Sequence, residues 1–206
     1  MDFYKDRVYP ALVNVLGNPG SIQALREQIV PLARGTVLEI GVGAGANFPY
    51  YDPTRVERLY AVDPNPGMVR LADGQRRRTP VDIEFLVLPG ERIPLADGSI
   101  DTVVSTFTLC TIPAVDQALR SMARVLKRHG RLIFLENCIA ADAKVQRWQR
   151  RWEPIHRRVF EGLLLTRDIP SLIVGAGFRM ERLERVYLSR FPKSWSHCCW
   201  GTARTI

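Results

Sequence analysis

The chain of 206 residues is 46% hydrophobic and 24% charged, a composition usual for a folded globular domain. This length fits a single domain that buries a sizeable core without disulfides or a structural metal. Lysine and arginine total 29 against 21 acidic residues, giving a net charge of +8. The basic residues are scattered outside 76–78 and 147–158, and neither stretch resembles a nucleic-acid motif, so no nucleic-acid partner is expected.

Targeting signals and cysteines give an expected compartment. No apolar run approaches the roughly 20 residues of a membrane-spanning helix, and residues 1–10 lack the apolar core of a signal peptide. The cysteines lack the spacing of a zinc site, so no metal is expected. Cys198 and Cys199 are interpreted as free thiols on opposite faces of a strand. These features predict a cytoplasmic protein.

The first two thirds of the chain alternate between helical and strand patterns. Leu25, Ile29 and Leu32 mark an amphipathic helix before the first strand. Buried parallel strands are predicted from short apolar or β-branched runs at 36–40, 59–62, 83–88, 100–105 and 131–135. Before the last of these, an amphipathic helix around 118–126 is predicted to end at Gly130. The alternation indicates an α/β fold with a doubly wound, mostly parallel sheet of about seven strands.

The pattern changes after the fifth strand. A helical stretch from about 143 to 165 is predicted to be interrupted by Pro154, and a shorter helix follows at 168–176. The runs 182–188 and 197–203 have no helix between them, which predicts a C-terminal antiparallel hairpin.

A glycine-rich turn follows the first strand. Gly41, Gly43 and Gly45 allow a tight turn and a close approach of a ligand to the backbone. Asp63 ends the next strand, where its carboxylate can accept hydrogen bonds from ribose hydroxyls. A dinucleotide and S-adenosylmethionine (SAM) both use this layout. Glu39 favours SAM, because a carboxylate beside the turn suits an ammonium and a sulfonium but repels a pyrophosphate.

The segment from Leu88 to Asp101 carries a third signal. It resembles the methyltransferase stretch usually written G-D-A-E-x-L-P-F-x-D-x-S-F-D. The first acid of that stretch, which binds the adenine amino group in the family, is replaced here by Pro89. The resemblance implies that the backbone N–H of Gly90 meets the adenine ring. Glu91 is expected either to take over the carboxylate role of the missing acid or to be a solvated loop carboxylate.

Together, the glycine turn and these segments resemble class I SAM-dependent methyltransferases of the ubiquinone/menaquinone-biosynthesis type (type 11). Trp152-Glu153-Pro154 and Leu165-Thr166-Arg167 narrow the resemblance to the methyltransferase-like alkyl-thiol S-methyltransferases. It implies an enzyme that uses SAM and releases S-adenosylhomocysteine. The cofactor-binding residues that it implies are Glu39, Gly41, Gly43, Gly45, Asn47, Asp63, Pro64, Asn65, Met68, Gly90, Glu91 and Thr106.

The same resemblance implies one methyltransferase domain over 1–206. Helices over the cofactor are expected in 1–34, the SAM-binding core in 35–140, and substrate-side helices with the terminal hairpin in 141–206. Within the core, Thr106 is expected to meet the amino-acid end of SAM or else to cap a backbone group. Cys110 is interpreted as a small pocket-lining residue.

Methyl transfer mainly requires that donor and nucleophile be aligned, an effect worth on the order of 7–11 kcal/mol. A base is needed only if the nucleophile arrives protonated, as a thiol does. The candidate catalytic residues are His156, Glu161 and Arg167, although His156 could instead be a core or surface histidine. Arg167 is expected either to bind a substrate anion or to pair with Glu161.

The expected partner is a small, partly apolar methyl acceptor, with a thiol as the first choice. The alternatives are C- or N-methylation of a quinone precursor or lipid headgroup, and a non-catalytic SAM-binding regulatory protein. Trp148, Trp152, Ile155 and Val159 form an apolar stripe at helical spacing. The stripe is interpreted either as packing over the active site or as a lid that also makes peripheral contact with an anionic membrane.

Overall fold

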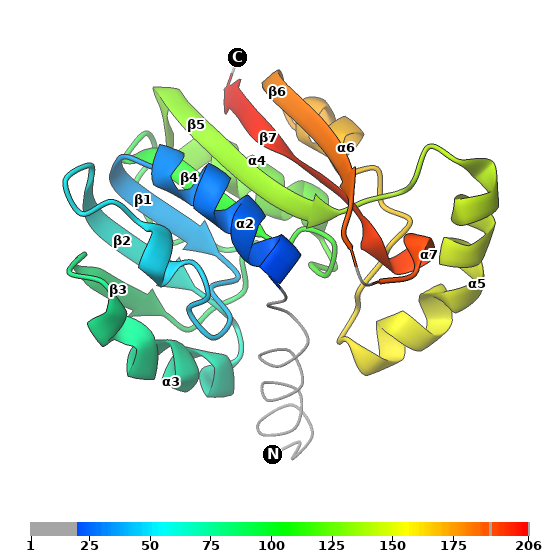
Figure 1. Ribbon diagram of the computed structural model, residues 1–206. Helices are drawn as coiled ribbons and strands as arrows, with labels where there is room; N and C mark the ends of the chain where they lie inside the picture. Colours follow the sequence, from blue (N-terminus) through cyan, green and yellow to red (C-terminus); the bar gives the residue numbers. More distant parts are fainter. Residues whose placement is uncertain (1–19, 190, 206) are drawn as a thin grey trace.

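The computed structural model describes residues 20–189 and 191–205, which form a seven-stranded sheet with helices on both faces (Figure 1). The strands are β1 (Gly35–Ile40), β2 (Val56–Val62), β3 (Ile83–Leu86), β4 (Ile100–Thr106), β5 (Leu126–Asn137), β6 (Phe178–Tyr187) and β7 (His197–Thr205). The α-helices are α2 (Gly20–Ile29), α3 (Pro66–Gln75), α4 (Val115–Val125), α5 (Ala143–Val159), α6 (Ile169–Gly175) and α7 (Lys193–Ser196). Short 3₁₀ turns are η2 (Val30–Leu32), η3 (Phe48–Tyr50) and η4 (Arg76–Arg78).

The strand order is β3-β2-β1-β4-β5-β7-β6. The pairs from β3 to β5 are parallel, while β7 runs antiparallel to both β5 and β6. This confirms the predicted α/β fold and the antiparallel C-terminal hairpin. From β1 the chain adds β2 and β3 on one side and then crosses over to add β4 and β5 on the other. A crevice therefore opens at the carboxyl ends of the strands where the order reverses, next to β1.

Alternate strand residues build two cores, one on each face of the sheet. Leu38 packs in the core that α4 and α6 cover, and Val37 packs in the one that α2 covers. Cys198 and Cys199 also fall into opposite cores, as predicted, and all four cysteines are buried free thiols.

The predicted end of the helix before the fifth strand is wrong. α4 ends at Val125, and β5 begins at Leu126, so Gly130 lies inside the strand. The pairing with β4 shifts register there, and a Cβ on Gly130 would lie 2.9 Å from the carbonyl oxygen of Lys127. The glycine therefore permits an irregularity in a strand.

Three further boundaries differ from prediction. β3 ends at Leu86, and β6 begins at Phe178, upstream of the predicted run. α5 continues through Pro154, although its axis bends in Figure 1, and it ends at Val159. Glu161 and Gly162 follow with positive φ values of 45° and 102°, which are incompatible with a continued helix.

The predicted N-terminal helices fall partly on residues 1–19, which lie outside the described residues. In the described part, α2 lies across the sheet ahead of β1 (Figure 1). No helix within 20–189 or 191–205 is long and apolar enough to cross a membrane.

Candidate active site

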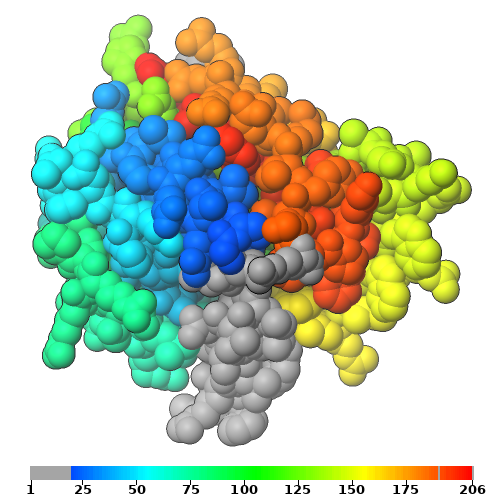
Figure 2. All heavy atoms as spheres, viewed as in Figure 1, coloured from blue at the N-terminus to red at the C-terminus, as the bar shows by residue number. Residues whose placement is uncertain are grey.

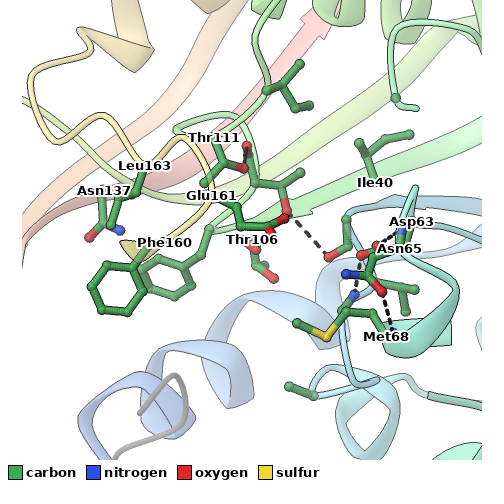
Figure 3. A pocket seen from close by; sticks show the side chains of 18 of the residues that line it. Ile40, Asp63, Asn65, Met68, Thr106, Thr111, Asn137, Phe160, Glu161 and Leu163 are labelled. Carbon is green, nitrogen blue, oxygen red and sulfur yellow. Dashed lines mark hydrogen bonds between the residues drawn. The ribbon is translucent and has the colours of Figure 1, made fainter. Parts of the chain in front are cut away.

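A cavity of about 660 Å³ opens at the carboxyl ends of β1, β2 and β4. Its strand-side half is formed by α2 and by the loops that follow β1, β2, β3 and β4. Its helix-side half is formed by residues 156–165 and by Leu188, Phe191 and Trp195. Figure 3 shows Asp63, Asn65 and Met68 gathered on one side, and Asn137, Phe160 and Leu163 on the other.

The three turn glycines have different environments. A Cβ on Gly41 would lie 2.1 Å from the Thr108 hydroxyl, so no side chain fits there. Gly43 has a positive φ of 53° and open space where its Cβ would lie, which leaves its backbone accessible from the cavity. Gly45 does not line the cavity. A Cβ on it would lie 2.8 Å from the ring of Phe48, so this glycine permits close packing of the turn instead.

Asp63 is held by its own loop. Its carboxylate accepts backbone N–H groups from Gly43 and Asn65, both at 2.9 Å. Burial raises the pKa of Asp63 above its ordinary value, although these two hydrogen bonds oppose the shift. The side chain of Asn65 caps α3 by accepting from the backbone of Gly67 and Met68. Asp63, Pro64, Asn65 and Met68 all line the cavity, and their contact with the cofactor stays a prediction.

Glu39 and Asn47 lie beneath the cavity rather than in its wall. The Glu39 carboxylate accepts hydrogen bonds from Tyr51 and Asn47, both at 2.8 Å. Burial raises the pKa of Glu39 to about 7, against the lowering effect of these two donors. Glu39 therefore does not contact a ligand in the cavity directly. It acts on one only through its electrostatic potential and by positioning Asn47 and Tyr51.

Arg26 was missed by the sequence analysis. It is 6% exposed, lines the cavity from α2, and donates to the side chains of Asn47 and Thr106. The only local signal is an arginine at helical spacing between Ile22 and Ile29, which are both buried. Its partners come from distant strand-end loops, so the sequence does not reveal the contact.

Thr106 ends β4 and lines the cavity. Its hydroxyl oxygen accepts from Arg26 at 3.0 Å and from Asn47 at 3.1 Å. The hydroxyl therefore still has its own O–H to donate.

Glu136 organises the loop that follows β4, another feature that the sequence analysis did not assign. Its buried carboxylate accepts the Ser105 hydroxyl and the backbone N–H groups of Thr108, Leu109 and Cys110, at 2.8–3.3 Å. Thr108 lines the cavity, whereas Cys110 is buried and does not, contrary to the prediction for it.

Gly90 and Glu91 line the strand-side half, next to Pro89. A Cβ on Gly90 would lie 2.8 Å from Ile40, so the close approach of this loop to β1 requires glycine. The Glu91 carbonyl is held by the Ser121 hydroxyl at 2.8 Å. The contact of these residues with adenine stays a prediction.

The helix-side half contains two of the three candidate catalytic residues, His156 and Glu161. His156 is 1% exposed and packs edge-on against Trp195, with ring centroids 4.5 Å apart. Neither ring nitrogen has a hydrogen-bond partner within residues 20–189 and 191–205, and burial lowers the pKa of His156 below its ordinary value. Glu161 lies close enough to Asp63 for its charge to raise the pKa of that carboxyl.

Arg167, the third candidate, does not line the cavity. Its guanidinium donates to the carbonyl oxygen of Leu109, in the loop that Glu136 organises. Arg167 therefore supports the cavity wall from behind, a position that neither predicted role for it describes.

Comparison with known proteins assigns the family. A model described as a methyltransferase domain matches residues 38–134. The human thiol S-methyltransferase TMT1A is 32% identical over 177 residues, which cover 83% of this chain and 70% of the relative. The chain belongs to the SAM-dependent methyltransferase family.

Two further similarities agree with this family. The ubiquinone/menaquinone biosynthesis C-methyltransferase UbiE of Rubrivivax gelatinosus is 36% identical over 110 residues, covering 53% of this chain and 39% of that protein. A SAM-dependent methyltransferase structure from Aquifex aeolicus superimposes with a TM-score of 0.66 at 20% identity, covering 96% of this chain and 98% of that one. The cofactor of this methyltransferase is therefore SAM, and its product is S-adenosylhomocysteine.

The cavity fits this cofactor. The accessible backbone at Gly43 leaves room for a ligand against the turn, and no described residue is a hydrogen-bond partner for the Nε atom of the buried Arg26. A guanidinium in the strand-side wall suits a carboxylate, which SAM carries at its amino-acid end.

Proposed function

We propose that this methyltransferase transfers the methyl group to a small, partly apolar thiol. The observation that carries the proposal is His156 in the apolar half of the cavity, whose two buried ring nitrogens have no hydrogen-bond partner among the described residues. An unsatisfied buried polar group costs about 1–3 kcal/mol, so an acceptor that hydrogen-bonds to the ring would recover this cost.

The strand-side half is assigned to SAM. Among the described residues, no carboxylate lies within ion-pair distance of Arg26, so this buried cation is left for the methionyl carboxylate. The O–H of Thr106 is available to donate to the same group. Asp63 is assigned to the ribose hydroxyls, and Gly90 with Glu91 to the adenine.

His156 is assigned as the base. When bound, SAM supplies an electrophilic methyl group on a positively charged sulfur. Because burial lowers the pKa of His156, its ring is neutral near pH 7 and has a nitrogen able to take a proton. A thiol has an ordinary pKa of about 8.5 and arrives mostly protonated, so transfer of its proton to the ring creates the thiolate nucleophile.

Glu161 and Arg167 are assigned supporting roles. Glu161 lines the cavity beside His156 and is assigned to contact the acceptor. The charge that favours the imidazolium formed when His156 takes a proton is that of Glu153, which opposes the effect of burial on the pKa of the ring. Arg167 positions the loop after β4 through the Leu109 carbonyl. Replacement of Glu161 or Arg167 by alanine should lower methyl transfer more than SAM binding.

The relatives support a thiol and also supply the rival acceptor. TMT1A is named as a thiol S-methyltransferase, and its match spans 83% of this chain. UbiE is named as a C-methyltransferase of quinone biosynthesis, and its match spans 53%. A quinone precursor is therefore the second candidate acceptor.

A panel of acceptors tests the proposal. The purified protein is incubated with SAM and an alkyl thiol, a quinol or an amine between pH 7 and 9, and S-adenosylhomocysteine is measured. We expect turnover with the thiol, rising with pH as thiolate accumulates. Turnover of quinol or amine but no thiol would contradict the thiol assignment while leaving methyl transfer intact. SAM binding without product from any acceptor would instead indicate a regulatory protein.

A further inference from the structure

The outer face of α5 exposes large apolar side chains. Trp148, Trp152, Ile155 and Val159 are 53%, 37%, 50% and 37% exposed. Their spacing of four, three and four residues places them along one side of the helix, here called the α5 outer face. The helix packs over the active site through His156, but the predicted apolar stripe does not take part in that packing. The buried side of α5 instead carries Val145, Gln149 and His156.

Basic residues border the α5 outer face. Lys144, Arg151 and Arg158 recur every seven residues, so they lie in a row beside the stripe, and all three are exposed. The helix also carries exposed arginines at Arg147, Arg150 and Arg157. Its one acidic residue, Glu153, accepts hydrogen bonds from Thr166.

The concentration of these residues distinguishes α5 from the rest of the described surface. The other exposed large apolar side chains lie on separate elements and loops, at Leu71, Val87, Val174, Tyr187 and Trp195. α5 itself lies against α7 at one side of the molecule, and its atoms project at the rim in Figure 2. The α5 outer face is therefore presented to a partner without obstruction from the sheet.

We propose that the α5 outer face docks on the surface of an anionic lipid bilayer. Tryptophan combines a large apolar ring with one polar N–H and prefers the boundary between headgroups and acyl chains. Arginine and lysine beside it match lipid phosphates and the negative surface of such a bilayer. A helix with one apolar side and many basic residues lies in the plane of the interface.

Charge favours lipid over a second copy of this chain. The chain carries a net charge of +8, and α5 alone contains six lysine and arginine residues against one acidic residue. Two copies joined through this face would bring the two basic rows together, and like charges repel. An anionic bilayer has the complementary charge and accepts the apolar side chains as well.

Docking would bring the active site close to the lipid. The buried side of the same helix carries His156, and Phe160 and Glu161 follow directly in the cavity wall. An apolar acceptor dissolved in the membrane would then be concentrated beside the helix-side half. This consequence for the acceptor rests on the proposed function, whereas the docking does not.

Vesicle sedimentation without SAM or acceptor tests the docking. Phosphatidylcholine vesicles with and without phosphatidylglycerol are mixed with the full chain, and bound protein and tryptophan emission are measured. We expect binding to anionic vesicles that weakens with salt, and a shift of the emission to shorter wavelengths. The double variant W148S/W152S should bind about tenfold more weakly or worse. R151Q/R158Q should lose most of the preference for anionic lipid.

Two matched controls isolate the face. R77Q/R78Q removes the same charge from exposed positions in η4, and V174S removes an exposed apolar residue from α6. Both should bind as the unchanged chain does. Circular dichroism and SAM affinity check that each variant is folded.

Three outcomes would overturn the proposal. One is no binding to anionic vesicles, and another is equal loss in R77Q/R78Q and R151Q/R158Q. The third is a dimer in solution that W148S/W152S dissociates, with no lipid binding by either protein. If W148S/W152S fails to fold, the R151Q/R158Q variant and the salt dependence of vesicle binding still test the docking. Failure of thiol turnover with intact vesicle binding would contradict only the proposed function.

Discussion

The two halves of the cavity differ in how their polar groups are satisfied. In the strand-side half, Asp63 accepts from the backbone of Gly43 and Asn65. Behind that wall, Asn47 donates to Glu39, and Glu136 accepts from the loop after β4. In the helix-side half, apolar side chains dominate, and the buried ring of His156 has no hydrogen-bond partner in the part of the chain that the structure describes. Apart from the Nε atom of Arg26, the strand-side wall is already hydrogen-bonded, so it is ordered before its ligand arrives, whereas the His156 wall is completed by the acceptor.

The largest expected effect is loss of stability in Glu136→Ala. This change leaves several buried N–H groups of the loop after β4 without an acceptor, so we expect a loss of about 3 kcal/mol or more in the free energy of unfolding. Urea denaturation measures it. Glu84→Ala is the control, since that side chain is 46% exposed. Equal losses in the two variants would remove the contrast between ordered and unfilled halves.

The sequence predicts the strand-side half better because its signals are local. Gly43 and Asp63 directly follow strands in the chain, and the parallel sheet brings those strand ends together. Arg26 and Glu136 could not be placed this way, because their partners lie far along the chain and in different loops. The hydrogen-bond partner of a buried polar residue depends on tertiary packing, which a short sequence motif does not predict.

α5 shows the same limit for helices. The spacing of Trp148, Trp152, Ile155 and Val159 predicts a helix with an apolar side, and the helix is present. The spacing does not tell which side packs, since Gln149 and His156 are buried while the tryptophans are exposed. Burial there is decided by the contacts of the helix with the cavity and α7.

Glu39→Gln should change how stability depends on pH. The pKa of Glu39 is raised from 4.5 to about 7, so its contribution is fully present below pH 4.5 and lost as pH rises through 7. At about 1.4 kcal/mol per pKa unit, the loss is on the order of 3 kcal/mol. The free energy of unfolding of Glu39→Gln, measured by denaturation across this pH range, should not show this loss. Glu57→Gln, at an exposed position, is the control, and its stability should depend on pH as that of the unchanged chain does. The same pH dependence in Glu39→Gln would contradict the burial of Glu39 in its hydrogen-bond network.

Asp63→Ala tests the assignment of the strand-side half. We expect SAM affinity to fall by about 1.5–3 kcal/mol, the scale of hydrogen bonds to a charged group. Calorimetric titration measures this, with Asp73→Ala as a control on the exposed side of α3. Unchanged affinity in folded Asp63→Ala protein would remove this carboxylate from the cofactor site.

His156→Phe should have the smallest effect on stability and the opposite pH dependence to Glu39. Because burial lowers the pKa of His156, its contribution is present above pH 6.5 and lost as pH falls through the lowered value. The phenylalanine variant should avoid that loss and gain stability relative to the unchanged chain in acid. The exposed His129→Phe is the control, and equal curves for all three proteins would show that His156 is not buried as a neutral ring.

The most direct test of the two-halves account measures SAM affinity and thiol methylation in the same His156→Phe protein. We predict that SAM binds as it does to the unchanged chain, while thiol turnover falls by about 10²–10⁴-fold, the usual contribution of a general base. Replotted against pH, the remaining turnover should follow the ionisation of the thiol alone. Turnover that stays unchanged, or SAM affinity that falls in step with it, would contradict the division of the cavity into a cofactor wall and an acceptor wall.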